Sequence, residues 1–127
     1  MNFRELIELG RRDVSCCKVN NNIKVGDCIC LVESINKNIY KGYSYKFTHF
    51  GYCAEQAALL NMFAHDEFSV SKIVTITKNG DVIPPCGRCL ELISQLNNPD
   101  FIEIAITGKE SKNFNEIYPY DWKKQRT

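Results

Sequence analysis

Hydrophobic residues recur along this chain with two different periods, and each change of period marks a change of predicted secondary structure. Residues 2–12 carry apolar side chains three or four positions apart, which indicates a first helix that ends before the polar segment VNNNIKVGD. Residues 27–34 and 38–45 alternate like two strands around the polar turn INKN, which predicts a hairpin. Because both faces of this hairpin are fairly apolar, we expect its sheet to be covered on two sides.

The second half of the chain alternates between helical and extended patterns. Residues 53–65 are apolar almost all round, as in a helix packed deep inside a domain. Residues 71–77 have the pattern of a buried strand, 86–96 of another helix and 101–107 of a last strand. The order strand, strand, helix, strand, helix, strand predicts a three-layer α/β/α sandwich on a mixed sheet of about five strands.

Length and composition favour one ordinary domain over residues 1–127. Of the 127 residues, 44% are hydrophobic and 24% are charged, which is typical of a globular chain with its own core. The net charge of +1 offers no field for a polyanion, so we expect no nucleic-acid partner. The basic stretch WKKQRT at 122–127 is expected to be a solvated tail.

The chain shows no sign of secretion or of a membrane span. Its N-terminal residues lack the apolar core of a signal peptide, and nowhere do 18 apolar residues follow one another. We therefore expect a cytoplasmic protein with no membrane partner. In such a reducing compartment, clustered cysteines bind metal or do chemistry more often than they form disulfides, and this chain has seven cysteines.

Three of these cysteines have the spacing of a metal site. Cys86 and Cys89 lie two residues apart at a predicted helix start, where their sulfurs share one face and free N–H groups favour the thiolate. Alone, this pair fits a redox couple or half of a structural zinc site equally well. Cys53, at another predicted helix start, adds a third ligand, and no fourth is well placed. Zinc with three protein ligands keeps a position for water, as catalytic sites do.

Glu55 gives this metal site a chemical use. It follows Cys53 by two residues, so it would lie beside the metal without binding it. A carboxylate at that place can take a proton from water and deliver it to a leaving group. A purely structural zinc site would instead need a fourth ligand and would have no use for the acid.

CAE at 53–55 followed by PCGRC at 85–89 resembles the cytidine deaminase superfamily, whose zinc signature is His or Cys, any residue, Glu, and later PCxxC. The order of elements is similar across nearly the whole chain, and VGD at 25–27 falls where the small cytidine deaminases carry VGA. The resemblance implies that Cys53, Cys86 and Cys89 bind zinc and that Glu55 shuttles the proton. It also implies hydrolysis of a cytosine-type nucleoside to its uracil form, with release of ammonia.

Within this superfamily, three cysteine ligands resemble the small homotetrameric enzymes that act on free nucleosides, whose active sites borrow residues from neighbouring subunits. YKFTHFGYCAE at 45–55 is most similar to the blasticidin S deaminase branch, which also reads PCGRC. The Asn-x-Glu pair that grips ribose in typical cytidine deaminases falls near Gly42 and Ser44, which cannot replace those contacts. The arginine that often follows CAE is Gln56 here.

The remaining candidate residues surround the predicted zinc site. The resemblance implies that Ala54 offers its backbone to the pyrimidine edge, and the candidate substrate contacts are Ala54, Ser44, Phe47 and Phe50. Gln56 and Arg88 are expected beside the thiolates, although Arg88 fits an exposed helix position equally well. The four other cysteines are expected to pack in the core as small apolar side chains: Cys16, Cys17, Cys28 and Cys30.

Two alternatives to a deaminase stay open. The first is a zinc-binding, deaminase-like protein without turnover that serves a ligand-binding or structural role. The second is redox use of Cys86 and Cys89 without a metal. Within the deaminase hypothesis, the substrate stays open among cytidine, deoxycytidine and a modified nucleoside such as blasticidin S.

Overall fold

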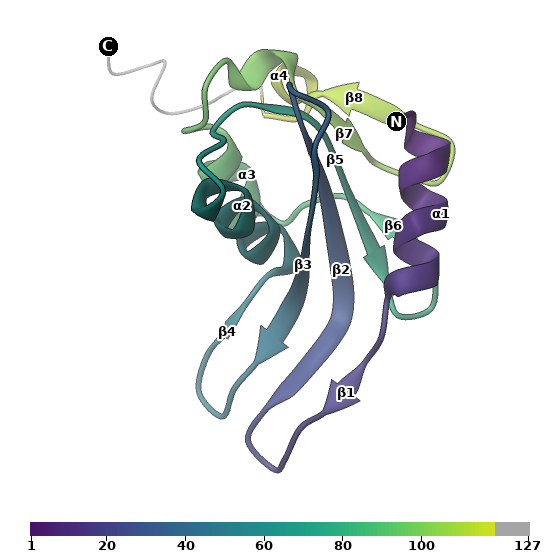
Figure 1. The fold of residues 1–127 in the computed structure, drawn as a ribbon, viewed down its shortest axis with the longest axis vertical. Coiled ribbons are helices and arrows are strands. Elements are labelled where there is room, and N and C mark those ends of the chain that lie inside the picture. The colour runs from purple at the N-terminus through teal and green to yellow at the C-terminus, as the bar shows by residue number, and fades with distance from the viewer. Residues whose placement is uncertain (119–127) are drawn as a thin grey trace.

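A long antiparallel hairpin forms the centre of the sheet in the computed structural model, which describes residues 1–118 (Figure 1). Its strands are β2 (Lys24–Ser34) and β3 (Ile39–Lys46), and β5 (Val70–Thr77) pairs antiparallel with the other side of β2. They correspond to the strands predicted over 27–34, 38–45 and 71–77. The basic stretch at 122–127 lies outside the described residues.

Shorter strands extend the sheet on both sides to the order β4-β3-β2-β5-β7-β8. They are β4 (Gly51–Tyr52), β7 (Glu103–Ala105) and β8 (Ser111–Asn113), with β1 (Cys17–Lys18) on β2 and β6 (Val82–Ile83) on β5. Only β5 and β7 run parallel among these pairs, so the sheet is mixed as predicted. Within the described residues it has eight strands rather than about five, because strands of two or three residues are too short to show a period.

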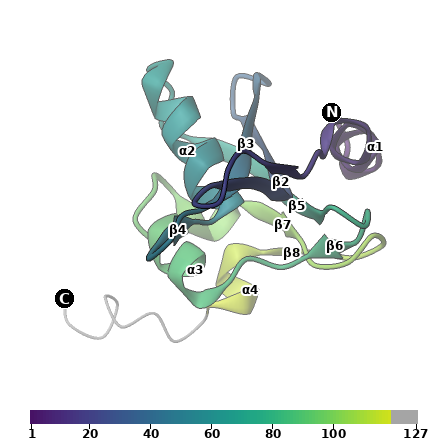
Figure 2. The ribbon, with the colours of Figure 1, turned by 90° about the horizontal axis from the view of Figure 1, so that it is seen from below.

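Helices cover both faces of the sheet, which confirms the α/β/α class (Figure 2). α1 (Phe3–Asp13) packs on one face, and α2 (Ala54–Ala64), α3 (Gly87–Ile93) and α4 (Phe114–Ile117) pack on the other. The helix predicted over 86–96 ends three residues early. The strand predicted over 101–107 is shorter too, because a 3-10 turn (Pro99–Phe101) precedes it.

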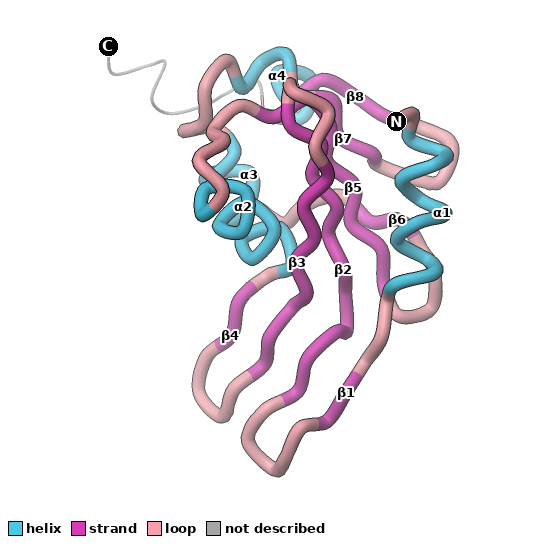
Figure 3. Tube along the Cα trace, in the orientation of Figure 1, coloured by secondary structure: helices cyan, strands magenta, loops and turns pink. Residues whose placement is uncertain are grey.

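Alternation along β2 supplies both cores, as the apolar faces of the hairpin predict. Ile29 and Leu31 are buried under α1, whereas Cys30 and Val32 are buried under α2. The lower ends of β2 and β3, together with β1 and β4, project beyond the helices (Figure 3). This projecting end leaves part of the α2 face of the sheet open beside the start of α2.

Two glycines set the geometry of that open face. Gly42 on β3 lies directly under α2, since a Cβ there would come within 2.1 Å of the Ala58 backbone nitrogen. Gly26 has a φ of +94° and lies in an irregular stretch of β2, where the register against β3 shifts between Val25 and Ile29. The first glycine lets helix and strand touch, and the second lets β2 bulge at the projecting end.

The expectation that four further cysteines pack in the core is wrong for Cys16 and Cys17, which are exposed. Both lie on the way into the projecting end, where no helix covers the chain, and the Cys16 thiol lies 3.4 Å from a carboxylate oxygen of Asp27. Cys28 is partly buried and Cys30 is fully buried, as expected. All seven cysteines are free.

Among the described residues, no helix has the length and apolar character needed to cross a membrane.

Candidate active site

Two helix starts bring three cysteine sulfurs together. Cys53 is the N-cap of α2, Cys86 is the N-cap of α3, and Cys89 lies in the first turn of α3. The Sγ atoms of Cys53 and Cys86 are 3.7 Å apart, and those of Cys86 and Cys89 are 3.4 Å apart. Sulfurs that bind one tetrahedral zinc at about 2.3 Å are separated by about 3.8 Å. The three thiols therefore already have the spacing that a shared zinc ion requires.

The donor set fits zinc with an open coordination position. Within residues 1–118, no other group of three His, Cys, Asp or Glu side chains has ligand atoms close enough to share an ion. Three sulfur donors suit zinc, and a structural zinc site would be closed by a fourth protein ligand. The site can thus hold a metal that keeps one position for water or substrate.

The three thiols differ in how easily they ionise. Burial raises the pKa of Cys53 and raises that of Cys89 well above its usual range. Partial burial acts in the same direction on Cys86, but its pKa is nevertheless lowered, because the Cys89 N–H and the neighbouring thiols stabilise its thiolate. Metal binding must displace protons from thiols with raised pKa values, so the affinity for zinc falls as the solution becomes acidic.

Glu55 lies in the first turn of α2 and is only 5% exposed. Burial raises the pKa of its carboxyl, and the Glu55 backbone N–H and the neighbouring Thr75 hydroxyl counteract part of that rise. A carboxyl with a raised pKa holds a proton more readily than an ordinary one, which suits a group that must both accept and donate a proton. Glu55 is therefore suited to general acid and base chemistry beside the thiols.

A cavity of about 390 Å³ opens onto this cluster from the projecting end of the sheet. Cys53, Glu55 and Cys86 line its inner part, and β3 and β4 form one wall. Its volume is within the range of sites that hold small molecules. The chain thus combines a metal-binding cluster, a buried acid and a cavity for a ligand in one place.

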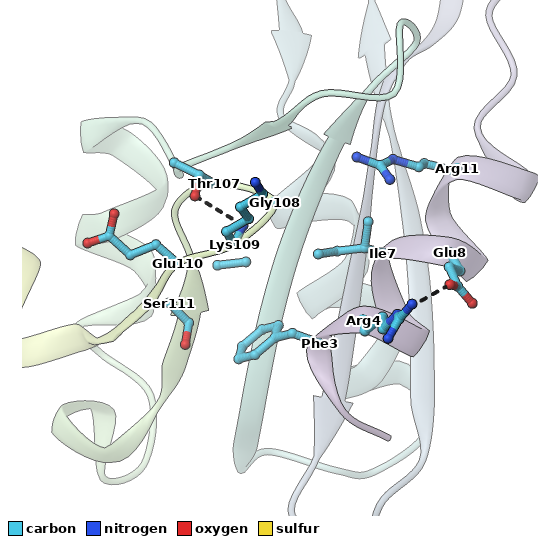
Figure 4. Close-up of a pocket in the computed structure, with 11 residues that line it drawn as sticks. Phe3, Arg4, Ile7, Glu8, Arg11, Thr107, Gly108, Lys109, Glu110 and Ser111 are labelled. Atoms are coloured by element: carbon cyan, nitrogen blue, oxygen red, sulfur yellow. Dashed lines mark hydrogen bonds and ion pairs between the residues drawn. The ribbon is translucent and has the colours of Figure 1, made fainter.

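A larger cavity of about 620 Å³ lies on the opposite face of the sheet, between α1 and the loop before β8 (Figure 4). No cysteine or histidine lines it, and Glu8 in its wall forms an ion pair with Arg4. Its lining contains no group of three possible metal ligands close enough to share an ion, so it is not the candidate active site.

The structure separates the predicted substrate contacts into two groups. Ala54 and Ser44 line the cavity, and the Ser44 hydroxyl accepts a hydrogen bond of 2.9 Å from the Cys28 N–H. Phe47 and Phe50 do not line it; their rings stack on each other with centroids 4.8 Å apart in the loop between β3 and β4. Phe50 is 61% exposed, so these rings form an aromatic surface beside the cavity.

Gln56 and Arg88 lie near the thiols in different ways. The Gln56 side-chain oxygen accepts a hydrogen bond of 3.1 Å from the Cys53 N–H and so caps α2. The Arg88 side chain is exposed, and its guanidinium has no ion pair within residues 1–118. Its backbone N–H helps to lower the pKa of Cys86.

Sequence reasoning missed Thr75, Cys28 and Lys46, which also line the cavity. Thr75 is 2% exposed, and its hydroxyl makes no hydrogen bond of ordinary geometry with the described residues. The sequence does contain a signal for Thr75, because it is a threonine in the middle of an otherwise mostly apolar buried strand. Cys28 and Lys46 gave no such signal, because only the pairing of the strands brings them to the cavity.

Solved cytidine deaminases have the same fold as this chain. The enzyme from Mycobacterium leprae is 18% identical, with a TM-score of 0.77 over 94% of this chain and 98% of that one. The enzyme from Burkholderia pseudomallei is 17% identical, with a TM-score of 0.72 over 94% and 98%. That from Bacillus anthracis is 16% identical, with a TM-score of 0.70 over 98% and 93%.

No protein-family model and no curated protein sequence matches the chain. The structural likeness extends over nearly the whole length of both chains at low identity, so it shows a shared fold.

Proposed function

We propose that this chain, which has the cytidine deaminase fold, is a zinc-dependent hydrolase that converts a cytosine-type nucleoside to its uracil form and releases ammonia. The observation that carries the proposal is the cluster of three thiols, with neighbouring sulfurs 3.4 and 3.7 Å apart, beside the buried carboxyl of Glu55. A metal-binding group and a proton-transferring group in one cavity are what hydrolytic deamination requires.

Cys53, Cys86 and Cys89 would hold the zinc, whose chemical contribution is to make water at the open position acidic enough to attack at neutral pH. The rest of the work falls to the chain. The two helix starts direct N–H groups at the sulfurs, and Gln56 fixes the first turn of α2 by accepting from the Cys53 N–H. The ligands are thereby positioned before the substrate arrives.

Glu55 carries the proton through the reaction. It accepts the proton from the attacking water, whose oxygen forms the bond to C4 of the base. It gives this proton to ring N3 as the C4–N3 double bond becomes single. It then takes the remaining proton of the new C4 hydroxyl and gives it to the exocyclic nitrogen as the C4–N bond breaks, so that ammonia leaves, a carbonyl forms at C4 and N3 keeps its proton. The burial that raises the pKa of Glu55 favours this temporary storage of the proton.

The substrate contacts form a second part of the proposal. Ala54 and Ser44 are in the wall of the cavity and are proposed to contact the substrate directly. Phe47 and Phe50 are proposed to contact it across a subunit boundary, as in a homotetramer. This is supported by exposed apolar side chains beside the cavity, including Phe50 at 61% and Leu60 of α2 at 56% exposed.

Light scattering tests the assembly: we expect four chains per particle, and a monomer would contradict it.

The charge of the cluster requires compensation. Two positive charges on zinc and three thiolates leave the site at −1, which makes bound water a weaker acid than neutral ligands would. Gln56 supplies no charge, so we propose that Arg88 and the helix N–H groups offset the thiolates.

The proposal includes a cytoplasmic location, which is supported by seven cysteines that are all free.

Metal analysis and a substrate panel test the proposed function. Protein purified without chelator should contain about one zinc per chain, and one of cytidine, deoxycytidine, cytosine or blasticidin S should be consumed with one ammonia released per molecule. Zinc without turnover of any of them would favour a ligand-binding or structural role. A metal-free protein with a reversible disulfide between Cys86 and Cys89 would favour redox use.

A further inference from the structure

The sheet face that forms the floor of the cavity changes in character from the inside outward. Cys30 on β2 pairs with Gly42 on one side and with Thr75 on the other, which forms an inner level beneath the start of α2. One step outward, the Cys28 N–H donates to the Ser44 hydroxyl. The inner level is buried and mostly apolar, as a planar base requires, and the next level offers a hydroxyl group.

The outermost level of this face is cationic. Lys46 on β3 follows Ser44 by two residues, lines the cavity and pairs across the strands with Lys24. The Lys24 and Lys78 ammonium groups lie 3.0 and 3.4 Å from the same carboxylate oxygen of Asp27. Lys46 forms no ion pair with the residues of the described range. Two ammonium groups thus share a single carboxylate at the outer end of the cavity, and the third, that of Lys46, is not paired with any described carboxylate.

This arrangement has a cost that an anion would relieve. Like charges directly opposite each other on neighbouring strands destabilise a sheet. Asp27 offsets the charge of Lys24 and Lys78 but leaves Lys46 without a counter-charge. An anionic group bound beside Lys46 would neutralise the excess, and it would be partly shielded by the walls of the cavity.

The spacing of the levels matches the length of a nucleoside. Residues two apart on a strand are separated by about 6.8 Å, so the Lys46 backbone lies about that far beyond Ser44. A base held at Glu55 and the cysteines would place its sugar over the middle level and a sugar substituent at the outer one. The Ser44 hydroxyl accepts from the Cys28 N–H and keeps its own hydrogen to donate to such a sugar, whereas the ammonium group of Lys46 at the outer level favours an anionic substituent.

We propose that the substrate carries an anionic group on its sugar, a phosphate or a carboxylate, and that Lys46 binds this group with help from Lys24. The inference rests on the proposed function, since it takes the deamination site as the place of the base. Lys46 is a specificity-determining residue in this account, and it takes no part in the proton transfers.

A comparison of three substrates tests the inference: cytidine, cytidine 5′-monophosphate and the analogue of cytidine whose 5′ carbon is a carboxylate. At least one anionic substrate should exceed cytidine in kcat/KM by about 10-fold or more, as expected for a charge-assisted contact. The two anionic substrates distinguish phosphate from carboxylate. The advantage should appear in KM rather than kcat and should shrink as salt is added.

Variants identify the residue responsible. Lys46→Gln should remove most of the advantage and its salt dependence, and Lys46→Arg should keep both. Lys109→Gln is the matched control, because it removes the same charge from the opposite face of the sheet. Equal kcat/KM for neutral and anionic substrates, or an advantage that survives in Lys46→Gln, would overturn the inference while leaving the deaminase proposal intact.

Binding of products tests the same point without turnover. By calorimetry, uridine bearing the preferred anionic group should bind more tightly than uridine to the wild-type chain but not to Lys46→Gln. If no cytosine compound is deaminated, the proposed function fails, and this measurement still decides whether Lys46 recognises an anion. Equal affinities of the wild-type chain for neutral and anionic products would contradict that recognition.

Discussion

Thr75 and Thr77 lie two residues apart on β5, but their hydroxyl groups differ in their hydrogen bonds. The Thr75 hydroxyl is buried beside Glu55 and makes no hydrogen bond of ordinary geometry within the described range, whereas the Thr77 hydroxyl accepts from the Asp81 N–H at 3.2 Å. A buried polar group without a partner lowers stability, and such groups in native proteins tend to have a use. Its position in the cavity wall suits Thr75 to contact a ligand or to orient Glu55.

Thr75→Val should therefore raise the free energy of unfolding by about 1 kcal/mol, because it removes, with little change of shape, a buried hydroxyl whose contact with the Glu55 carboxyl falls short of ordinary hydrogen-bond geometry. Thr77→Val is the matched control and should lower it by a similar amount, because a hydrogen bond is lost. Urea denaturation of the three proteins measures both. A Thr75→Val protein less stable than wild type would show that the hydroxyl has a stabilising partner.

At the scale of single residues, spacing was enough to predict which side chains of the cluster lie together. The CxxC and CAE spacings predicted that Cys53, Cys86, Cys89 and Glu55 would meet, and the structure brings them together. Lys46 could not be identified in this way, because its place depends on the register between β2 and β3. The core expectation for Cys16 failed because composition says nothing about which segments a helix covers.

At the scale of elements, the contact between β3 and α2 positions half of the site. α2 carries Glu55 and begins at Cys53, and it lies so close to β3 that a Cβ on Gly42 would come within 2.1 Å of the helix backbone. A backbone atom cannot turn away as a side chain can, so any larger residue at this position must displace the helix.

Gly42→Ala should lower the free energy of unfolding by about 2 kcal/mol or more and should weaken zinc binding, because displacement of α2 moves Cys53 away from the other two sulfurs. Gly87→Ala is the control: no atom lies within 4 Å of its added Cβ, although it is in α3 between the ligands. Thermal unfolding and zinc titration measure the effects. A Gly42→Ala protein with wild-type stability and zinc affinity would contradict the tight contact.

A group of hydrogen bonds to one carboxylate joins the β2–β3 hairpin to the segment after α2. The Glu67 carboxylate accepts hydrogen bonds from the Tyr40 hydroxyl and from the side-chain amides of Asn38 and Asn36. These bonds, led by the one from Tyr40, lower the pKa of Glu67 to about 2. The carboxyl of an unfolded chain titrates near 4.3, so the bonds stabilise the fold only while Glu67 is ionised.

For a carboxyl whose pKa is depressed on folding, this stabilisation is complete above about pH 4.3 and disappears as the pH falls toward 2. Glu67→Gln should therefore be less stable than wild type at pH 7, and the difference should shrink between pH 4 and pH 2. Urea denaturation at several pH values measures it, with the exposed Glu8→Gln as a control for loss of charge. A difference that does not change with pH would contradict the role of the ionised carboxyl.

The long elements were predictable and the short ones were not. The helices expected over 2–12 and 53–65 are found within one residue at each end, because several turns of a clear period define them. The two-residue strands β4 and β6 contain no period and form only because a neighbouring strand offers them hydrogen bonds. Tertiary pairing, rather than local preference, creates these elements.

At the scale of the whole molecule, the fold assigns different tasks to the two faces of the sheet. The α1 side has an apolar core around the inner side chains of β2 and β5 and a cavity that no cysteine lines, whereas the α2 side combines a core with the open projecting end, where the cavity beside the three cysteines lies. The layered class followed from the order of elements. The position of the cavity beside the cysteines did not follow from the order of elements. It depends on where α2 begins and on the irregular pairing of β2 near Gly26.

The central claim is that zinc and Glu55 act together on a cytosine-type substrate, and one comparison tests it most directly. Zinc content and the rate of ammonia release are measured for the wild-type chain and for Glu55→Gln with the best substrate of the panel. We predict equal zinc, about one per chain, and a rate lower by roughly 10²- to 10⁴-fold in the variant, because one group serves as both base and acid. Ammonia release at the wild-type rate from zinc-loaded Glu55→Gln would contradict the account.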